Sequence, residues 1–229
     1  MTAKVTVKKD DATYAGQAVY TASVLRLYNL RTLHYNLPVL WRCPKRHLLA
    51  LYDEHVSAHH LDVGVGTGYL LERCKFPSPS PEIALMDLNA IPLRHAAHRL
   101  RRFEPKLHQA DVLVPWQLTP GSFDSVAMVN LLHCLPGNMR DKSVIFEHAS
   151  GALAPGGTLF GATVLGEDVE LSRRARRTMK NFNQRGIFSN LEDNLEDLRG
   201  GLDRVFGSSE VEMQGAVALF AAHKPKTSG

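Results

Sequence analysis

The chain of 229 residues is 44% hydrophobic and carries a net charge of +4, so it can bury the core of one sizeable α/β domain. This small positive charge is compatible with an anionic substrate but too weak to require a nucleic acid. The three cysteines are scattered and form no C-x-x-C pair, which predicts reduced thiols in a cytoplasmic protein. No apolar run approaches the roughly 20 residues of a membrane helix, so we expect no membrane partner.

Residues 1–57 are expected to form an N-terminal arm and a helical cap. Apolar spacing predicts one helix between Gln17 and Arg31, and a second helix should begin behind Pro44, because proline suits the first turn. Four aromatic side chains of this cap either line a substrate pocket or simply pack the helices down. They are Tyr14, Tyr20, Tyr35 and Trp41.

Residues 58–223 alternate predicted strands with predicted helices, a spacing typical of a mostly parallel sheet. Asn89 is suited to cap the helix after the second strand, and the turn at residues 154–157 should end a later helix. The predicted strands are one that begins at Leu61, followed by residues 83–87, 107–111, 123–129, 158–164, 211–213 and 216–222.

Two helices interrupt this alternation and form a predicted helical insert at about residues 166–206. Ser189 and Glu192 have the spacing of a capping box at the start of the second helix. After the insert, the Gln214–Gly215 turn should join the last two strands as an antiparallel hairpin. Residues 224–229 are expected to be a flexible tail.

The segment LDVGVGTGY at residues 61–69 is predicted to be a buried strand that runs into a glycine turn and then a helix. Its three glycines stand at alternate positions, so the backbone can bend sharply and approach a ligand closely. A dinucleotide-binding loop would carry glycine where Tyr69 stands. Asp62 would repel a pyrophosphate at this turn, so it favours a ligand with a positively charged amino group.

This acid-x-G-x-G-x-G segment resembles the first motif of the class I S-adenosylmethionine-dependent methyltransferases. The resemblance implies an α/β, Rossmann-like fold, with a mostly parallel seven-stranded sheet, an antiparallel C-terminal hairpin and an N-terminal helical cap. It covers residues 61–164 well and the final hairpin moderately. The helical insert matches only in kind, as a family-variable cap over the substrate.

The same resemblance implies S-adenosylmethionine as the cofactor, bound beyond the C-terminal ends of the strands. Asp62 and the glycine backbone would hold the methionine part, Asp87 the ribose hydroxyls and Asp111 the adenine amino group. Each acid alone could be a solvated strand end or a helix cap, but three in succession after the glycine loop favour a binding site. The expected cofactor-binding residues are Asp62, Gly64, Gly66, Thr67, Gly68, Asp87, Leu88, Asp111, Val112 and Asn130.

The implied reaction is the attack of a nucleophilic atom on the sulfonium methyl group, for which alignment and exclusion of water supply much of the catalysis. His133 is the expected general base and a substrate contact, together with Tyr20 and Trp41. The alternative is that His133 only orients substrate or packs beneath the next helix. The sequence at residues 130–133 lacks the Asn/Asp-Pro-Pro-Tyr/Phe pattern of enzymes that methylate amino groups of bases or of glutamine, which disfavours those acceptors.

We therefore expect methyl transfer to a small molecule, most readily to a hydroxyl of an aromatic or polyketide-like metabolite. The alternatives are an RNA or protein methyltransferase that docks through the arginines at residues 173–177, or a cofactor-binding protein of this fold that transfers no methyl group. The arginines are expected to be a solvated helix face, which disfavours a nucleic acid partner. His55, His59 and His60 lack nearby zinc-ligand spacing, so no metal is expected. The oligomeric state stays open, with a homodimer as one option.

Overall fold

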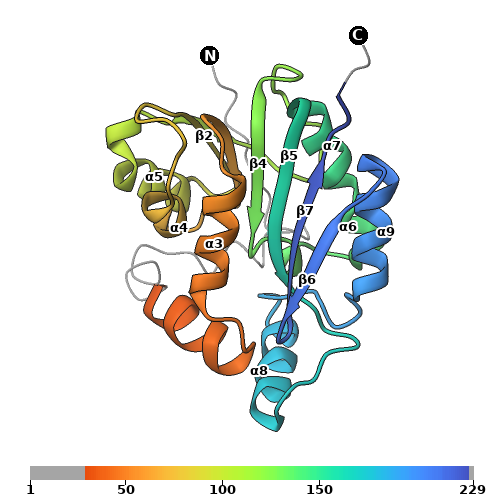
Figure 1. Cartoon of the computed structure of the whole chain (residues 1–229). Coiled ribbons are helices and arrows are strands. Elements are labelled where there is room, and N and C mark those ends of the chain that lie inside the picture. The colour runs from red at the N-terminus through yellow and green to blue at the C-terminus, as the bar shows by residue number, and fades with distance from the viewer. Residues whose placement is uncertain (1–28, 227–229) are drawn as a thin grey trace.

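Strands with apolar residues on both faces form the centre of the molecule. The computed structural model describes residues 29–226 and places seven strands in the order β3-β2-β1-β4-β5-β7-β6 (Figure 1). The pairs from β3 to β5 are parallel, whereas β7 runs antiparallel to β5 and β6, which confirms the predicted sheet. The strands are β1 (His59–Val63), β2 (Glu82–Asp87), β3 (Lys106–Gln109), β4 (Phe123–Val129), β5 (Leu153–Val164), β6 (Glu210–Gln214) and β7 (Val217–His223).

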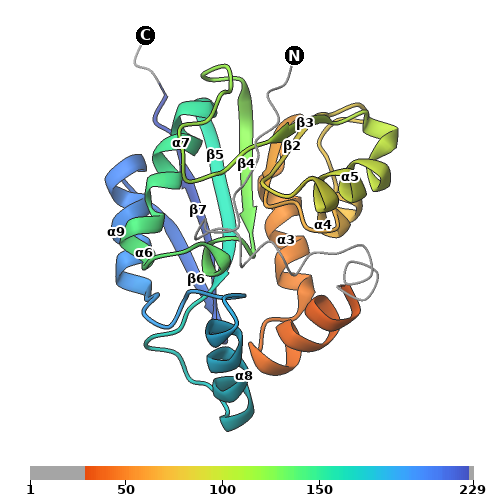
Figure 2. The same cartoon turned by 180° about the vertical axis from the view of Figure 1, so that it is seen from behind.

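Helices cover both faces of the sheet (Figures 1 and 2). Because successive side chains of a strand point to opposite faces, β4 contributes Ala127 and Val129 to one hydrophobic cluster and Val126 and Met128 to the other. The first cluster includes the π-helix η1 (Asn29–Leu40), α3 (Lys45–His55), α4 (Tyr69–Arg73), α5 (Ala90–Arg99) and α8 (Arg173–Gln184). The second includes α6 (Met139–Lys142), α7 (Val144–Ala152) and α9 (Leu195–Phe206).

The helix starts agree in part with those predicted. Asn89 caps α5 as predicted, because its side chain accepts a hydrogen bond from the backbone N–H of Ile91. α3 begins at Lys45, directly behind Pro44 as predicted, although Pro44 is the N-cap residue rather than part of the first turn. Two short 3-10 helices, η2 (Arg101–Phe103) and η3 (Leu132–Cys134), complete the elements. No described helix is long and apolar enough to span a membrane.

The start of α9 differs from the prediction. Asn194 caps this helix by accepting a hydrogen bond from the backbone N–H of Asp197 at 2.8 Å. The capping box predicted at Ser189 and Glu192 is therefore wrong. The Ser189 hydroxyl donates instead to the backbone carbonyl of Gly137, since this segment is tied to α6 rather than wound into a helix.

The helix before residues 154–157 ends at Ala152, close to the prediction, but these four residues belong to β5, which begins at Leu153 and pairs irregularly with β4 there. The predicted flexible tail begins at Lys224. Lys224 is anchored, since its ammonium donates to the carbonyls of Ser150 at 2.6 Å and Leu153 at 2.7 Å. Residues 227–229 lie outside the described residues.

A buried ion pair fastens the helical insert to the sheet. Lys142 of α6 donates to the Asp193 carboxylate at 2.6 Å and to the carbonyl of Ser189, and neither charged side chain is exposed to solvent. The Asn190 amide donates to the carbonyl of Val164, at the end of β5, at 2.8 Å. These bonds hold the segment before α9 against the strand ends.

Replacing Lys142 with methionine should lower the free energy of unfolding by about 3–5 kcal/mol, because it leaves the Asp193 charge buried without a partner. Adding Asp193→Asn to this variant should recover part of the loss, since the unpaired charge is then removed. The ion pair of the exposed Arg140 with Asp197 offers a matched control, and Arg140→Met should lower the stability far less, because water already screens this arginine. Denaturant titration measures all three; equal losses for Lys142→Met and Arg140→Met would contradict the prediction.

Candidate functional site

The C-terminal ends of β1, β2 and β4 border one pocket. All ten residues predicted to bind a cofactor line it, namely Asp62, Gly64, Gly66, Thr67, Gly68, Asp87, Leu88, Asp111, Val112 and Asn130. The pocket encloses about 1100 Å³, counting the space open to solvent. Residues that the sequence reasoning did not assign to the site complete its wall, among them Tyr52 from α3, Leu33 from η1 and Cys134 after β4.

The glycine turn forms the floor of this pocket. Gly64, Gly66 and Gly68 have φ angles of +72°, +52° and +67°, in the left-handed region that side chains disfavour. A Cβ on Gly64 would also lie 2.9 Å from the Leu131 side chain. The backbone therefore turns beneath the pocket at positions where only glycine fits without strain.

Asp62 is a buried carboxylate that forms no ion pair within residues 29–226. The Tyr52 hydroxyl donates to its Oδ2 at 2.8 Å. Burial raises the pKa of Asp62 to about 7, the hydrogen bond from Tyr52 opposes this rise, and the charge of Asp87 adds to it. A ligand that brings positive charge would relieve this unfavourable burial.

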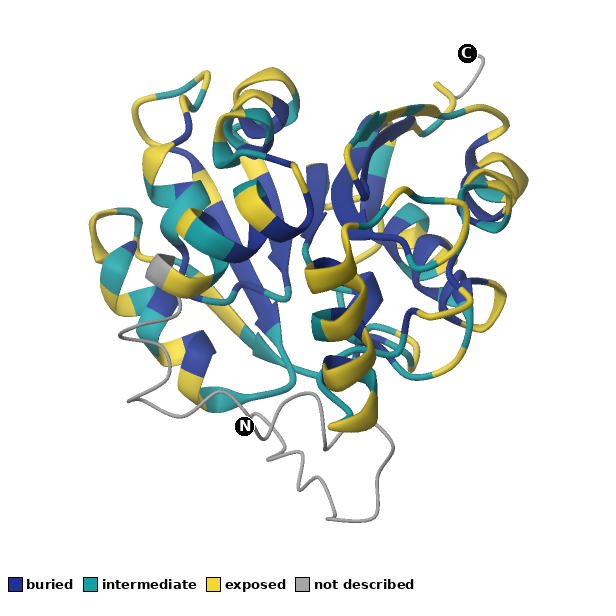
Figure 3. Cartoon of the chain, turned by 90° about the horizontal axis from the view of Figure 1, so that it is seen from below, coloured by how far each residue is buried: buried dark blue, intermediate teal, exposed yellow. Residues whose placement is uncertain are grey.

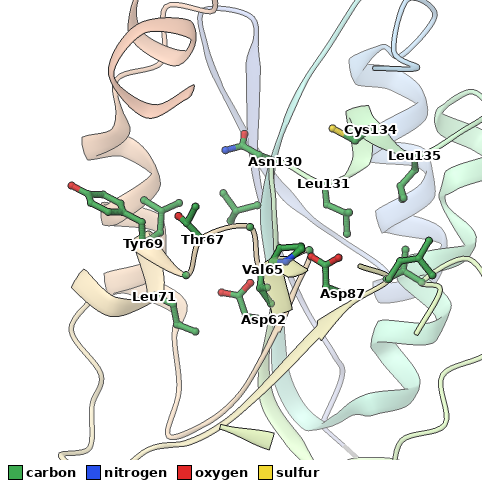
Figure 4. A pocket seen from close by; sticks show the side chains of 18 of the residues that line it. Asp62, Val65, Thr67, Tyr69, Leu71, Asp87, Asn130, Leu131, Cys134 and Leu135 are labelled. Carbon is green, nitrogen blue, oxygen red and sulfur yellow. The ribbon is translucent and has the colours of Figure 1, made fainter. Parts of the chain in front are cut away.

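Asp87 is the last residue of β2, and Asp111 follows β3. Asp87 accepts a hydrogen bond from the backbone N–H of Asn89 at 2.9 Å, and burial raises its pKa to about 7. Asp111 lies two residues beyond β3, which ends earlier than predicted, and accepts from the backbone N–H of Leu113 at 2.9 Å. Figure 4 shows Asp62 and Asp87 at the ends of neighbouring strands, with Asn130 beyond the glycine turn.

Asn130 presents an acceptor that the protein does not use. Its φ of +62° directs the chain sharply out of β4, while its backbone N–H donates to the carbonyl of Ala162 at 2.8 Å. The side-chain oxygen is buried and has no hydrogen-bond partner among the described residues. Such an oxygen costs about 1–3 kcal/mol unless a ligand donates to it.

His133 does not line the pocket, in contrast to the prediction. It is 4% exposed, and its Nδ1 accepts a hydrogen bond from the backbone N–H of Val164 at 3.2 Å. The neutral ring therefore carries its proton on Nε2, so neither nitrogen can take up a proton without breaking this bond. Burial and the charge of Lys142 lower the pKa of His133 to about 3. The geometry favours the packing alternative over the general-base role.

The predicted substrate contact Trp41 does not line the pocket either. Trp41 is 2% exposed and packs against Phe188 at a ring separation of 6.1 Å, because it forms part of the core beneath the cap. Tyr20 lies outside the described residues.

The arginines at residues 173–177 form the outer face of α8, as predicted. Ala175, Met179 and Phe182 of the same helix are buried, while the arginines are exposed. Figure 3 views the molecule from the α8 end and shows helices with exposed outer faces around buried strands. Arg174 lies over the Tyr35 ring of η1, with 5.3 Å to its centre.

Comparison with known proteins agrees with this geometry. The family model of a methyltransferase domain matches residues 61–159. Demethylluteothin O-methyltransferase of Streptomyces thioluteus is 41% identical to the chain over 213 residues, which are 93% of each protein. The chain belongs to the class I S-adenosylmethionine-dependent methyltransferases. The O-methyltransferase of the physcion biosynthesis cluster of Aspergillus chevalieri is 38% identical, over 93% of this methyltransferase and 97% of that protein.

Solved structures of low sequence identity share the fold of this methyltransferase. Phosphoethanolamine N-methyltransferase 2 of Haemonchus contortus, in complex with phosphomonomethylethanolamine and S-adenosylhomocysteine, has a TM-score of 0.70 at 17% identity. The match covers 94% of this chain and 61% of that chain. The N-methyltransferase NodS of Bradyrhizobium japonicum WM9, in complex with S-adenosylhomocysteine, has a TM-score of 0.59 at 17% identity, covering 94% of this chain and 100% of that chain.

Asp62→Asn should stabilise the ligand-free methyltransferase at high pH. The pKa of Asp62 is about 7 in the folded chain, compared with an ordinary value of 3.8 for an aspartate in the unfolded chain. The free energy of unfolding therefore decreases as the pH rises from 3.8 to about 7. A neutral amide does not incur this loss, and the variant should exceed the wild type by about 2–4 kcal/mol above pH 7. Denaturant titrations at pH 4.5 and pH 8 measure the difference, which should be small at the lower pH. A variant no more stable at pH 8 would contradict the raised pKa.

His133→Ala should lower the free energy of unfolding by about 2–4 kcal/mol, because it opens a cavity and leaves the Val164 N–H without an acceptor. His133→Asn keeps an acceptor near the Nδ1 position and should lose less. Denaturant titration gives the stabilities, and the pH dependence of kcat should keep its shape in the asparagine variant. A stable asparagine variant that has lost turnover would instead favour the general-base role.

Proposed function

We propose that this chain binds S-adenosylmethionine in the pocket and transfers its methyl group to a hydroxyl of a small aromatic or polyketide-like molecule. The observation that carries the proposal is a pocket that combines the buried Asp62, the partly buried Asp87 and an Asn130 oxygen without a hydrogen-bond partner among the described residues. Its described lining contains no lysine, arginine or histidine. Such a lining favours a ligand with positive charge and hydrogen-bond donors. The O-methyltransferases of 41% and 38% identity support the acceptor class.

The polar groups of the pocket fit the parts of this cofactor. Asp62 and Asn130 would accept hydrogen bonds from the amino group of the methionine part, and the glycine backbone leaves room beneath it. Asp87 would accept from the ribose hydroxyls, and Asp111 from the adenine amino group. When bound, the cofactor supplies a methyl group already activated by its sulfonium.

The pocket lining that follows Asn130 in the chain determines which protein groups could take a proton from the acceptor. In the described lining, residues 131–136 contribute Leu131, Cys134, Leu135 and Pro136 and no carboxylate or imidazole. Burial raises the pKa of the Cys134 thiol to about 12, so it stays neutral. We therefore infer that the preferred acceptor is an acidic hydroxyl, a phenol or an enol, which ionises without a strong protein base. The chain would contribute alignment and exclusion of water.

The test is incubation with S-adenosylmethionine labelled in its methyl group and a panel of phenols, enolic polyketides and matched amines. Label should pass to phenols or enols, and the rate should rise with pH through the pKa of the acceptor itself. Asp87→Ala should weaken S-adenosylhomocysteine binding at least about tenfold by calorimetry, because hydrogen bonds to the ribose are lost. Glu196→Ala, an exposed change on α9, is the control and should bind normally.

Three outcomes would overturn parts of this proposal. Transfer to amines alone would refute the acceptor class, and cofactor binding without transfer to any acceptor would favour a protein that keeps the fold but not the reaction. Tight binding of NAD with no affinity for S-adenosylhomocysteine would refute the assignment of the pocket.

A further inference from the structure

A tyrosine from outside the glycine segment contacts the first acid of the pocket. Tyr52 lies in the last part of α3, and its hydroxyl donates to Oδ2 of Asp62 at 2.8 Å. Tyr52 is 2% exposed and lies at the pocket wall. Its hydroxyl therefore acts on the Asp62 carboxylate from the side of the helical layer.

The Tyr52 ring has little freedom to point elsewhere. It packs edge-on against Phe160 of β5, with 5.2 Å between the ring centres and an interplanar angle of 87°. The His60 ring of β1 lies 6.3 Å from it, again edge-on. The donor that meets Asp62 is consequently fixed by the core.

The Tyr52 hydroxyl matters for the charge of Asp62 because of the other charged and titratable groups around this carboxylate. Tyr52 faces it from α3, Asp87 from β2 and Cys74 from the end of α4, and none of these groups is a cation. Burial and Asp87 both favour the protonated form of Asp62. Among the described groups that face Asp62, the Tyr52 hydroxyl favours the ionised form, because it donates a hydrogen bond to the carboxylate.

We propose that Tyr52 is a positioning residue that holds the Asp62 carboxylate oriented toward the amino group of the bound cofactor. Because Oδ2 is occupied by the hydroxyl, the carboxylate cannot rotate freely, and its negative charge is retained for the ligand. The inference rests on the proposed function, since it requires that S-adenosylmethionine occupies this pocket. It extends that proposal by making α3 part of the amino-acid end of the cofactor site.

The test compares two ligands by calorimetry between pH 6 and pH 8.5. S-adenosylhomocysteine carries the amino acid part, whereas 5′-methylthioadenosine keeps the nucleoside but lacks this part. Tyr52→Phe should weaken S-adenosylhomocysteine binding about tenfold near pH 7, the loss expected for one charge-assisted hydrogen bond, and leave 5′-methylthioadenosine binding unchanged. The pH below which S-adenosylhomocysteine binding falls should move upward, because Asp62 then holds its proton to a higher pH.

Two further variants separate positioning from simple packing. Tyr35→Phe removes another hydroxyl, which has no hydrogen-bond partner within residues 29–226 and lies outside the pocket lining, and should leave both affinities unchanged. In an Asp62→Asn background, Tyr52→Phe should produce no further loss, because the hydroxyl acts through the carboxylate.

Unchanged S-adenosylhomocysteine affinity in Tyr52→Phe at every pH would overturn the inference. Equal loss of both ligands would do the same, since it would indicate a merely structural role. An additive loss in the Asp62→Asn background would show that the hydroxyl does not act through Asp62. Wild-type protein that binds neither ligand would refute the proposed function itself, which distinguishes that failure from a failure of the Tyr52 assignment alone.

Discussion

The burial of Asp62 and Asp87 at one edge of the sheet is the constraint on which the site depends. Both carboxylates lie where parallel strands end, and burial raises the pKa of each to about 7. The folded chain tolerates this cost because the sheet and its two helical layers are otherwise well packed, with apolar clusters on both faces. Because burial disfavours the negative charges of these carboxylates, a ligand that brings positive charge into the pocket should bind favourably.

The glycine turn and the strand ends were predictable from the sequence because they depend on local physics. The alternate glycines of residues 64–68 require left-handed angles, and the acids after the strands meet at one edge because the strands are parallel. The ten predicted cofactor residues consequently line one pocket. The mostly parallel character of the sheet follows from the alternation of strands with helices, and its antiparallel hairpin from the Gln214–Gly215 turn, but these patterns do not fix the order of the strands.

What could not be predicted depends on where side chains point after the chain has folded. His133 follows β4 as expected, but its ring turns toward the N–H of Val164, a contact between residues 31 positions apart. Ser189 has the spacing of a helix cap, yet the buried bond between Lys142 and its carbonyl holds that segment outside any helix. Tyr52 belongs to the helix predicted behind Pro44, and a buried tyrosine hydroxyl usually finds a hydrogen-bond partner. The sequence alone does not indicate that this partner is Asp62.

The contact between α3 and β1 affects where a boundary can be drawn between the N-terminal cap and the methyltransferase domain. The segment matched by the family model begins at residue 61, and the cap was expected to end at residue 57, so both boundaries separate Tyr52 from Asp62. Transplanting the motif-bearing segment behind a foreign leading helix would carry over its glycines and acids but not the hydroxyl that lowers the pKa of Asp62. The smallest interchangeable module is therefore the helix together with the strand that follows it.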